Sequence, residues 1–279
     1  MPFTVATWNV NSVRKRLDHV ARFAAATTVD VLCLQETKVV NDLFPSEAFT
    51  EMGFPYQAIA GMKGYNGVAI LSRRPLSDVR VERWLDRDDC RHIHARVETG
   101  TGPVEVHSLY VPAGGDDPDP DANPKFAYKL AFLDALAPFL AERATGQERL
   151  YILGDFFEAW IGDDERTPLQ EQVAAALKAV RASGTELFLM HGNRDFLIGE
   201  AFCDRAGAVL LDDPTVVDLY GEPTLLMHGD SLCTVDVEYQ KFRANMRNPQ
   251  WQQMILSRPL AERQTMARQL RDISMAKNQ

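Results

Sequence analysis

Short apolar runs and helix-periodic segments alternate along the first half of the chain. Apolar or alternating runs predict strands at residues 4–8, 31–34, 68–72, 92–97 and 104–111. Apolar residues that recur at helical spacing predict helices over about 13–27 and 126–140. An acidic, proline-rich stretch between the last of these strands and the second helix predicts a loop. This order of elements predicts an α/β protein.

The second half starts with the same alternation and ends in a different pattern. Strands are predicted at 150–153, 187–190 and 224–227, and a helix is predicted over about 169–180. From about residue 236 the pattern is helical and rich in Arg, Gln, Leu and Met, with Pro249 and Pro259 as breaks. The sequence therefore predicts a helical C-terminal segment after the α/β part.

Polar side chains follow several of the predicted strands at the point where each strand ends. These residues are Asn9, Glu36, Asp155, Asn193 and His228. In α/β sheets, ligands bind beyond the carboxyl ends of strands. A strand cap or a turn residue would account for any one of them. As a set they favour divalent cations, because carboxylate, amide and imidazole groups are metal ligands, and two such ions can clamp a phosphoryl group.

Charge and composition narrow the classes of partner. The chain has 279 residues, is 46% hydrophobic and has a net charge of −9, which is enough apolar material for one large or two small cores. The stretch 149–236 carries 6 basic and 16 acidic residues, whereas 237–279 carries 8 and 3. The acidic middle suits divalent cations. The basic tail suits an anionic partner such as nucleic acid, phospholipid or nucleotide, or is a solvated helix face.

The N-terminal stretch and the cysteines favour a cytoplasmic protein. The chain starts MPFTVATWNV, without a basic region leading into a long apolar stretch, so no signal peptide is predicted. No apolar run reaches the ~18 residues of a spanning helix. The four cysteines show no CxxC spacing, which favours reduced and mostly buried thiols.

Three long motifs mark the second half. Residues 154–164 read GDFFEAWIGDD, residues 191–196 read HGNRDF, and residues 228–234 read HGDSLCT. In order and spacing they resemble the UDP-2,3-diacylglucosamine hydrolase family of calcineurin-like metallophosphoesterases, which acts in bacterial lipid A synthesis. The resemblance covers about 149–279. It implies hydrolysis of the pyrophosphate of a UDP-linked glycolipid to UMP and a lipid phosphate.

The same resemblance implies roles for individual residues. Asp155 would bridge two metal ions, most simply Mn²⁺, and Asn193 and His228 would be ligands of one of them. Arg194 would stabilise charge on the phosphate in the transition state. Substrate contacts are implied for Asp236, Ser274 and Asn278. The helices after about 236 resemble that family's lid, which implies peripheral contact with the inner membrane of a bacterium. No protein partner is predicted.

The second half departs from its family in two metal-binding motifs. The family opens with an Asp-x-His strand end, where this chain has Thr7-Trp8-Asn9 near its start. It closes with a Gly-x-His motif that supplies two more histidines, and the last histidine here is His228. An acidic residue usual in the family is replaced by Val235. Four of the implied metal ligands are therefore missing.

Other motifs mark the first half. Residues 7–14 read TWNVNSVR, 34–38 read LQETK, 65–72 read YNGVAILS, and 109–112 read LYVP. They resemble exonuclease III and the apurinic endonucleases, over about residues 1–148. The resemblance implies that Glu36 binds Mg²⁺, that Asn9 supports the site, and that Tyr110 contacts the scissile phosphate of abasic or duplex DNA.

This site is also incomplete. Phe157 stands where that family has Asn. The family also has a later Ser-Asp-His motif, which is absent here because no histidine follows His228. The loop around 144–147 is the best candidate for a boundary, so we expect two parts at 1–148 and 149–279. Because both families are four-layer α-β-β-α sandwiches, we expect that fold, built from two incomplete halves with a helical C-terminal segment.

Three functions remain open from the sequence. The first is a metal-dependent phosphoester or pyrophosphate hydrolase most like UDP-2,3-diacylglucosamine diphosphatase. The second is an exonuclease III-like apurinic endonuclease and 3′-5′ exonuclease of DNA repair. The third is an inactive hybrid that folds and binds a cation without turnover, since both sites lack their C-terminal histidine motifs.

Overall fold

The chain divides into two compact units. The computed structural model describes residues 3–115, 120–157, 159–232, 234 and 236–277, with side chains in the last helix as far as Leu270. Unit 1 comprises residues 1–132 and 213–235, and unit 2 comprises 133–212 and 236–279. These units follow contacts within the fold, whereas the boundary expected at 148/149 separates two sequence resemblances and stays a proposal.

A six-stranded sheet forms the centre of unit 1. Its order is β11-β12-β1-β2-β4-β3. The strands are β1 (Phe3–Asn9), β2 (Val31–Gln35), β3 (Tyr56–Ala60), β4 (Val68–Ser72), β11 (Thr215–Leu219) and β12 (Glu222–Met227). Because β1 runs parallel to both β2 and β12, the carboxyl ends of these three strands share one edge of the sheet. The predicted strands at 4–8, 31–34, 68–72 and 224–227 are confirmed.

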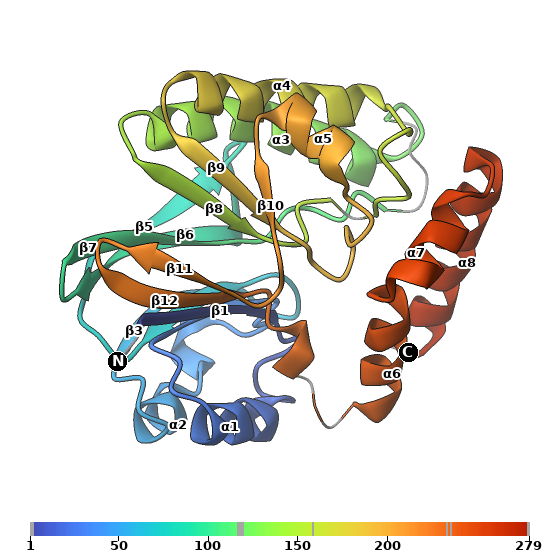
Figure 1. The fold of residues 1–279 in the computed structure, drawn as a ribbon. Coiled ribbons are helices and arrows are strands. Elements are labelled where there is room, and N and C mark those ends of the chain that lie inside the picture. Colours follow the sequence, from blue (N-terminus) through green and yellow to red (C-terminus); the bar gives the residue numbers. More distant parts are fainter. Residues whose placement is uncertain (1–2, 116–119, 158, 233, 235, 278–279) are drawn as a thin grey trace. The chain divides into compact units, whose positions relative to one another are not determined.

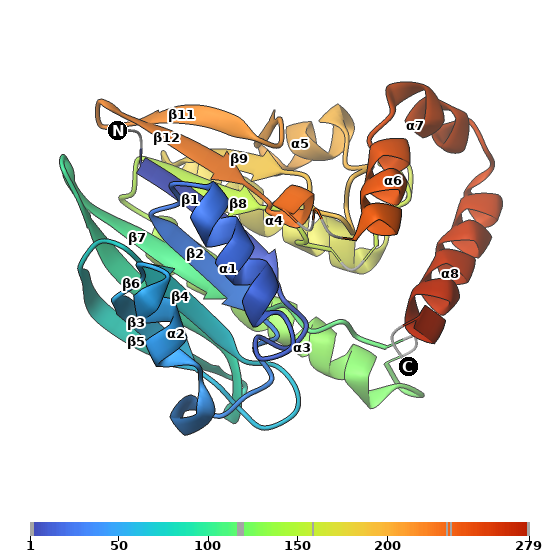
Figure 2. The same ribbon diagram turned by 90° about the horizontal axis from the view of Figure 1, so that it is seen from below.

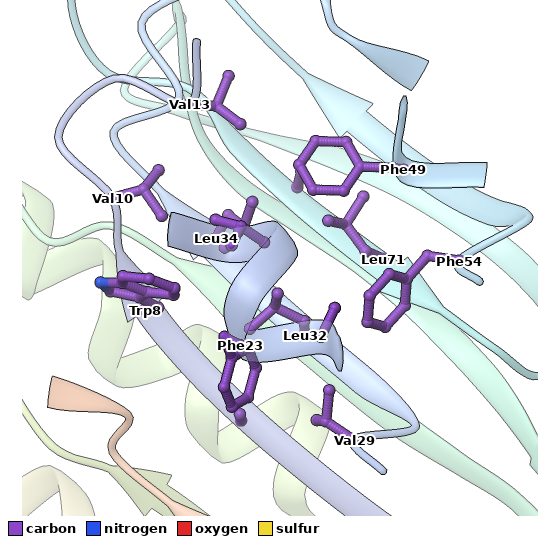
Figure 3. Packing of buried hydrophobic residues seen from close by; sticks show 14 of the residues in the cluster. Trp8, Val10, Val13, Phe23, Val29, Leu32, Leu34, Phe49, Phe54 and Leu71 are labelled. Carbon is purple, nitrogen blue, oxygen red and sulfur yellow. The ribbon is translucent and has the colours of Figure 1, made fainter. Parts of the chain in front are cut away.

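The two faces of this sheet are covered differently (Figure 1). One face packs against α1 (Leu17–Ala26) and α2 (Ser46–Glu51), and the short 3-10 turn η1 (Asn41–Leu43) precedes α2 in the chain. The buried cluster there includes Trp8, Phe23, Leu34 and Phe54 (Figure 3). Against the other face lies a second, antiparallel sheet of order β5-β6-β7. Its strands are β5 (Leu76–Trp84), β6 (Arg87–Thr99) and β7 (Gly102–Leu109).

The first helix begins four residues later than its apolar pattern predicted. The amides of Ser12 and Val13 donate to the carbonyl oxygens of Glu36 and Thr37, at 2.7 and 3.1 Å, so these residues belong to a loop that pairs with the end of β2. Val13 is nevertheless fully buried, because it joins the same core as α1. Periodicity therefore identified the buried face, and the hydrogen bonds determine where the helix begins.

Unit 2 contains a small parallel sheet and its covering helices (Figure 2). The sheet order is β10-β9-β8, from β8 (Arg149–Leu153), β9 (Glu186–Met190) and β10 (Val209–Leu211). The helices are α4 (Pro168–Ala182), α5 (Glu200–Ala206) and the later part of α3 (Pro124–Ala144). A capping box between Thr167 and Gln170 starts α4. The predicted α/β class is confirmed.

Three further helices of unit 2 confirm the predicted helical C-terminal segment. They are α6 (Val237–Met246), α7 (Pro249–Leu256) and α8 (Leu260–Lys277). Arg247, at the end of α6, donates to the carbonyl oxygens of His191 and Gly192 at 3.2 and 3.1 Å. The buried Arg263 of α8 donates to the carbonyl oxygen of Ile161 and to Asp164. The helices are therefore tied to the loops that follow β8 and β9. Among the described residues, no helix has the length and apolarity that crossing a bilayer requires.

The thiols of the described cysteines are free, as expected for a reduced protein. Cys33 lies within β2 and is fully buried, and burial raises its pKa to about 12. Burial likewise raises the pKa of Cys203 to about 11. Such thiols stay protonated at neutral pH and are poor nucleophiles. Cys90 is half-buried, and Cys233 lies outside the described residues.

One buried carboxylate joins the strand ends of unit 2. The Asp195 side chain is 1% exposed. Its Oδ1 accepts the amides of Gly192 and Asp155, at 2.7 and 3.3 Å, and its Oδ2 accepts the amides of Phe156 and Phe157, at 2.8 and 3.3 Å. The segments after β8 and after β9 are therefore held to each other by a single side chain.

We expect Asp195→Ala to lower the free energy of unfolding by about 3 kcal/mol or more, because it leaves buried backbone amides without their acceptor. Denaturant titration followed by circular dichroism measures the change. Asp204→Ala, an exposed site on α5 of the same unit, is the matched control and should stay within about 0.5 kcal/mol. Equal midpoints for the two variants would contradict this role of Asp195.

Candidate functional site

The residues predicted from strand ends fall into two groups, one in each unit. Unit 1 contains Asn9, Glu36, Tyr110 and His228. Unit 2 contains Asp155, Asn193, Arg194 and Asp236.

In unit 1, Glu36 is the centre of a hydrogen-bonded cluster just after β2. Its Oε1 accepts a hydrogen bond from Asn9 Nδ2 at 2.8 Å and another from the Tyr110 hydroxyl at 2.9 Å. Its Oε2 lies 2.7 Å from Lys38 Nζ. The structure thus brings together three residues that the sequence assigned to one site. Lys38 completes the cluster.

The pKa of Glu36 reflects a balance of opposing effects. Burial is the largest influence and raises the pKa, because it disfavours the charged form. Hydrogen bonds from Asn9 and Lys38, the charge of Lys38 and the hydrogen bond from Tyr110 together outweigh burial. The net result is a pKa below the ordinary value for glutamate, so this carboxylate is ionised at neutral pH.

The backbone around Glu36 is held in a conformation that most residues avoid. Glu36 and Lys38 both have φ of 54°, and the facing loop has Asn11 at 42° and Ser12 at 85°. Such left-handed conformations cost about 1–3 kcal/mol each for residues other than glycine and persist only where the surroundings impose them. This concentration of strain supports a functional role for the loops that carry Asn11 and Glu36.

His228 follows β12, at the same sheet edge as Asn9 and Glu36. Its side chain is buried, and its amide donates to Asp213 Oδ1 at 3.0 Å. The next residue must be small, because a Cβ on Gly229 would lie 2.0 Å from the carbonyl oxygen of Thr7. This close approach fixes the turn that carries His228 against the end of β1.

In unit 2, Asp155 and Asn193 follow the adjacent strands β8 and β9. Asp155 Oδ1 accepts the amide of Arg194 at 2.9 Å. A Cβ on Gly192 would lie 2.1 Å from Asp155 Oδ1, so only glycine allows the two loops to approach. Asp155 itself has φ of 53°, a second case of strain at a predicted ligand. The two predicted ligands of this unit are thus placed on touching loops.

The amide oxygen of Asn193 distinguishes this group. It is buried and has no hydrogen-bond partner among the described residues. A buried acceptor in that state costs about 1–3 kcal/mol unless something else satisfies it. A divalent cation would do so, because hard cations take carboxylate and amide oxygens. Arg194, the next residue in the chain, has an exposed side chain, and a guanidinium suits a phosphate.

Of the three predicted substrate contacts, Asp236 alone has a described side chain. Asp236 is the N-cap of α6, where its Oδ1 accepts the amide of Tyr239 at 2.9 Å. Ser274 lies in α8, beyond the last described side chain, and Asn278 lies outside the described residues. Substrate contact by these three residues therefore stays a proposal.

Two residues at these sites received no structural role from the sequence. Lys38 ends the LQETK motif, and the structure shows it in an ion pair with Glu36. Asp195 was part of a motif, but nothing in its spacing showed that it would be buried and would accept four amides. An acidic residue two positions after Asn193, followed by the apolar residues 196–198, was the available signal.

Known proteins match the chain in two parts. UDP-2,3-diacylglucosamine hydrolase from Marinobacter nauticus is 80% identical over 145 residues, which are 52% of this chain and 59% of the relative. The hydrolase of that name from Hahella chejuensis is 61% identical over 141 residues, 50% of this chain and 58% of the relative. The chain therefore spans less than two thirds of the length of these curated relatives. The expected hydrolase resemblance of the second half is confirmed.

The other part matches nucleases. A 3′-5′ exonuclease from Neisseria meningitidis has a solved structure that is 36% identical, with a TM-score of 0.50, and the match covers 60% of this chain and 62% of that one. The expected nuclease resemblance is confirmed as well. Residues 6–156, more than half of the chain, match the model of the Endonuclease/Exonuclease/phosphatase family, and the chain belongs to that family.

Proposed function

We propose that this chain is a divalent-metal-dependent hydrolase of phosphoric esters or anhydrides, most like UDP-2,3-diacylglucosamine diphosphatase, with Asp155 and Asn193 as metal ligands. The observation that carries the proposal is the buried amide oxygen of Asn193, which has no hydrogen-bond partner among the described residues, on the loop that touches Asp155. The identity of up to 80% to hydrolases of this name, over half the chain, supports the choice of substrate.

The residues of unit 2 suit phosphate chemistry. A bound divalent cation supplies a Lewis acid and a more acidic water. Arg194 would bind the phosphate oxygens and stabilise the charge that develops on them. The Arg194 amide donates to the Asp155 carboxylate, so the backbone of Arg194 is held against this proposed ligand. Mn²⁺ is the proposed ion.

The helical segment fits a long amphiphilic substrate. Arg247 connects the end of α6 to the loop after β9, which carries Asn193. Arg263 connects α8 to the loop after β8, which carries Asp155. Residues 237–279 also carry five more basic than acidic side chains. We propose that this segment acts as a lid that contacts the UDP-linked glycolipid through Asp236, Ser274 and Asn278. A position at the cytoplasmic surface of a bacterial inner membrane belongs to the same proposal.

His228 stays a predicted ligand. It belongs to unit 1, and its amide is fixed by Asp213. A ligand set made only of Asp155 and Asn193 is small for Mn²⁺, which takes about six ligands. Water would therefore fill most positions, and weak binding is expected. Because the histidine motifs that supply further metal ligands are missing, we also propose that turnover is low.

A nuclease function is the second candidate, and the Glu36 cluster favours it. Asn9, Glu36 and Tyr110 are joined as that resemblance implies, on a strained loop. The cluster fits a metal less well than the group in unit 2 does. Both oxygens of Glu36 are engaged by side-chain donors, and Lys38 already neutralises the carboxylate. Mg²⁺ would have to displace Lys38 to bind there.

A chain that folds and holds a cation without turnover is the third candidate. Each resemblance lacks the C-terminal histidines of its family, since the sequence contains no histidine after His228. Metal binding and the product formed, UMP or a nicked abasic duplex, distinguish the three functions.

We expect Mn²⁺ titration by calorimetry to show binding that Asn193→Ala weakens about tenfold or more, because the variant removes an oxygen ligand. Glu36→Ala is the control in unit 1 and should leave the affinity unchanged. A His228→Ala variant, titrated in parallel, shows whether that imidazole contributes. If Glu36→Ala abolishes binding and Asn193→Ala does not, the metal site is the Glu36 cluster of unit 1.

We expect detergent-solubilised UDP-2,3-diacylglucosamine to release UMP in the presence of excess Mn²⁺. Arg194→Ala should lower the rate about 100-fold, because it removes a cation placed for the transition state. Arg166→Ala, at an exposed site of unit 2, should leave the rate unchanged. If UMP fails to appear and an abasic duplex is nicked with Mg²⁺, the nuclease function replaces this one. If the chain forms neither product but still binds Mn²⁺, the third function, an inactive hybrid, is supported.

We expect Lys38→Met to raise the pKa of Glu36 toward its ordinary value, because a hydrogen bond and a positive charge are lost. Since the folded-state pKa of Glu36 is depressed, its contribution to stability is present above the unfolded-state pKa. That contribution is lost as the pH falls through the lower folded-state value. Carboxyl NMR titration measures the pKa. Lys63→Met, at an exposed site in unit 1, should leave the Glu36 pKa unchanged.

A further inference from the structure

Three potential metal ligands lie together on β6 and β7, on strands that supply none of the metal ligands discussed above. His94 and His107 are directly opposite each other in the antiparallel pair. Glu105 lies two residues before His107 and therefore on the same face of β7. One ligand atom from each of the three side chains lies within 4.8 Å of the other two. Rigid neighbouring strands thus place two imidazoles and one carboxylate around one point.

The two imidazoles are closely packed. The rings of His94 and His107 are stacked, with centroids 5.0 Å apart and planes inclined by 20°. His107 Nε2 lies 2.9 Å from Glu105 Oε1, and His107 Nδ1 lies 2.8 Å from His92 Nε2. A proton is shared at each of these two contacts. A dication that binds to such ligands displaces their protons.

The surroundings of His94 match those of metal-binding histidines. Its side chain is fully buried, and its Nε2 lies 3.2 Å from Glu82 Oε1 on β5. Metal-binding histidines commonly have a carboxylate near the imidazole, and Glu82 takes that place here. Glu105 Oε2 faces Arg96, at 3.9 Å, which leaves Oε1 on the side of His107. His107 and Glu105 are 28% and 24% exposed, so solvent reaches the group from their side.

The donor set selects the class of ion. Imidazole suits zinc, copper, iron and nickel, whereas magnesium and calcium require oxygen ligands. Two histidines and one carboxylate, with a remaining position for water, are a known zinc arrangement. Zinc bonds of about 2.0–2.2 Å require ligands roughly 3.4 Å apart, so small side-chain rotations suffice to close the group.

We propose that His94, Glu105 and His107 form a binding site for a transition-metal dication, with Zn²⁺ as the ion of choice. The site links β6 to β7 within unit 1. Glu82 orients His94, and His92 connects the group to Trp84, whose ring is stacked on His92 at 5.6 Å. The proposal is independent of the hydrolase function, because none of these residues belongs to either group of predicted ligands.

Zn²⁺ titration of the whole chain by calorimetry, in excess Mg²⁺ to occupy oxygen-rich sites, tests the proposal. One equivalent should bind to the parent chain, and His107→Gln and Glu105→Gln should each lower its affinity about tenfold or more. Both substituted side chains are partly exposed, so these variants should fold, and circular dichroism checks this. Glu98→Gln, an exposed position on the same face of β6, is the matched control.

A second readout reports the location of the ion. Ni²⁺ bound at this group should quench part of the tryptophan fluorescence, and Trp84→Phe should remove that part of the quenching. Asn193→Ala should leave both the Zn²⁺ affinity and the quenching unchanged, which separates this site from the one proposed in unit 2. The proposal is overturned if Zn²⁺ binds equally well to the parent, His107→Gln and Glu105→Gln chains, or if the parent binds none.

Discussion

The parallel pairing of β1 with β12 is the interaction on which unit 1 depends. Residues 3–6 pair with residues 224–227, so the first strand of the nuclease-like part is hydrogen-bonded to a strand of the hydrolase-like part. Arg74 strengthens the contact by bridging Asp30, at 3.0 Å, and Glu222, at 2.8 Å. Without β12 and its partner β11, β1 would be an open sheet edge, which is a site for aggregation.

This pairing also determines the chemistry at the edge of the sheet. It aligns the carboxyl ends of β12, β1 and β2, which carry His228, Asn9 and Glu36. Two resemblances that were incomplete separately thus contribute residues to one sheet. The hydrogen bonds of the backbone do not depend on ancestry, because any strand of suitable length and apolarity can pair with β1.

The two groups of predicted ligands differ in how their charge is balanced. Glu36 is satisfied by side chains of its own unit, with Lys38 as its counter-ion. Asn193 instead has a buried oxygen without a hydrogen-bond partner among the described residues. The Glu36 carboxylate therefore already has its partners, whereas the Asn193 oxygen is an acceptor that a bound cation would satisfy. This difference places the hydrolase ahead of the nuclease among the proposed functions.

The sequence predicted the elements whose patterns were strong and missed those whose patterns were weak. Residues 68–72 are fully buried and read as a strand without ambiguity. Residues 76–84 form β5 although most of their side chains are exposed, because the partner β6 and its register hold them there. At the sites, strand ends identified Glu36 and Asp155. The ion pair of Lys38 with Glu36 could not be predicted from residue spacing, because it depends on tertiary contacts. The same is true of the four backbone amides that donate to Asp195.

The pairing of β1 with β12 joins residues about 220 positions apart, and this separation matters while the chain is being made. A ribosome adds roughly 5–20 residues per second, so β1 waits ten seconds or more for its partner. During that time the edge of β1 is unpaired, so a chaperone must cover it or it can pair with another chain. Synthesis that stops before residue 222 would release a protein with an unfinished sheet, whatever the state of its active sites.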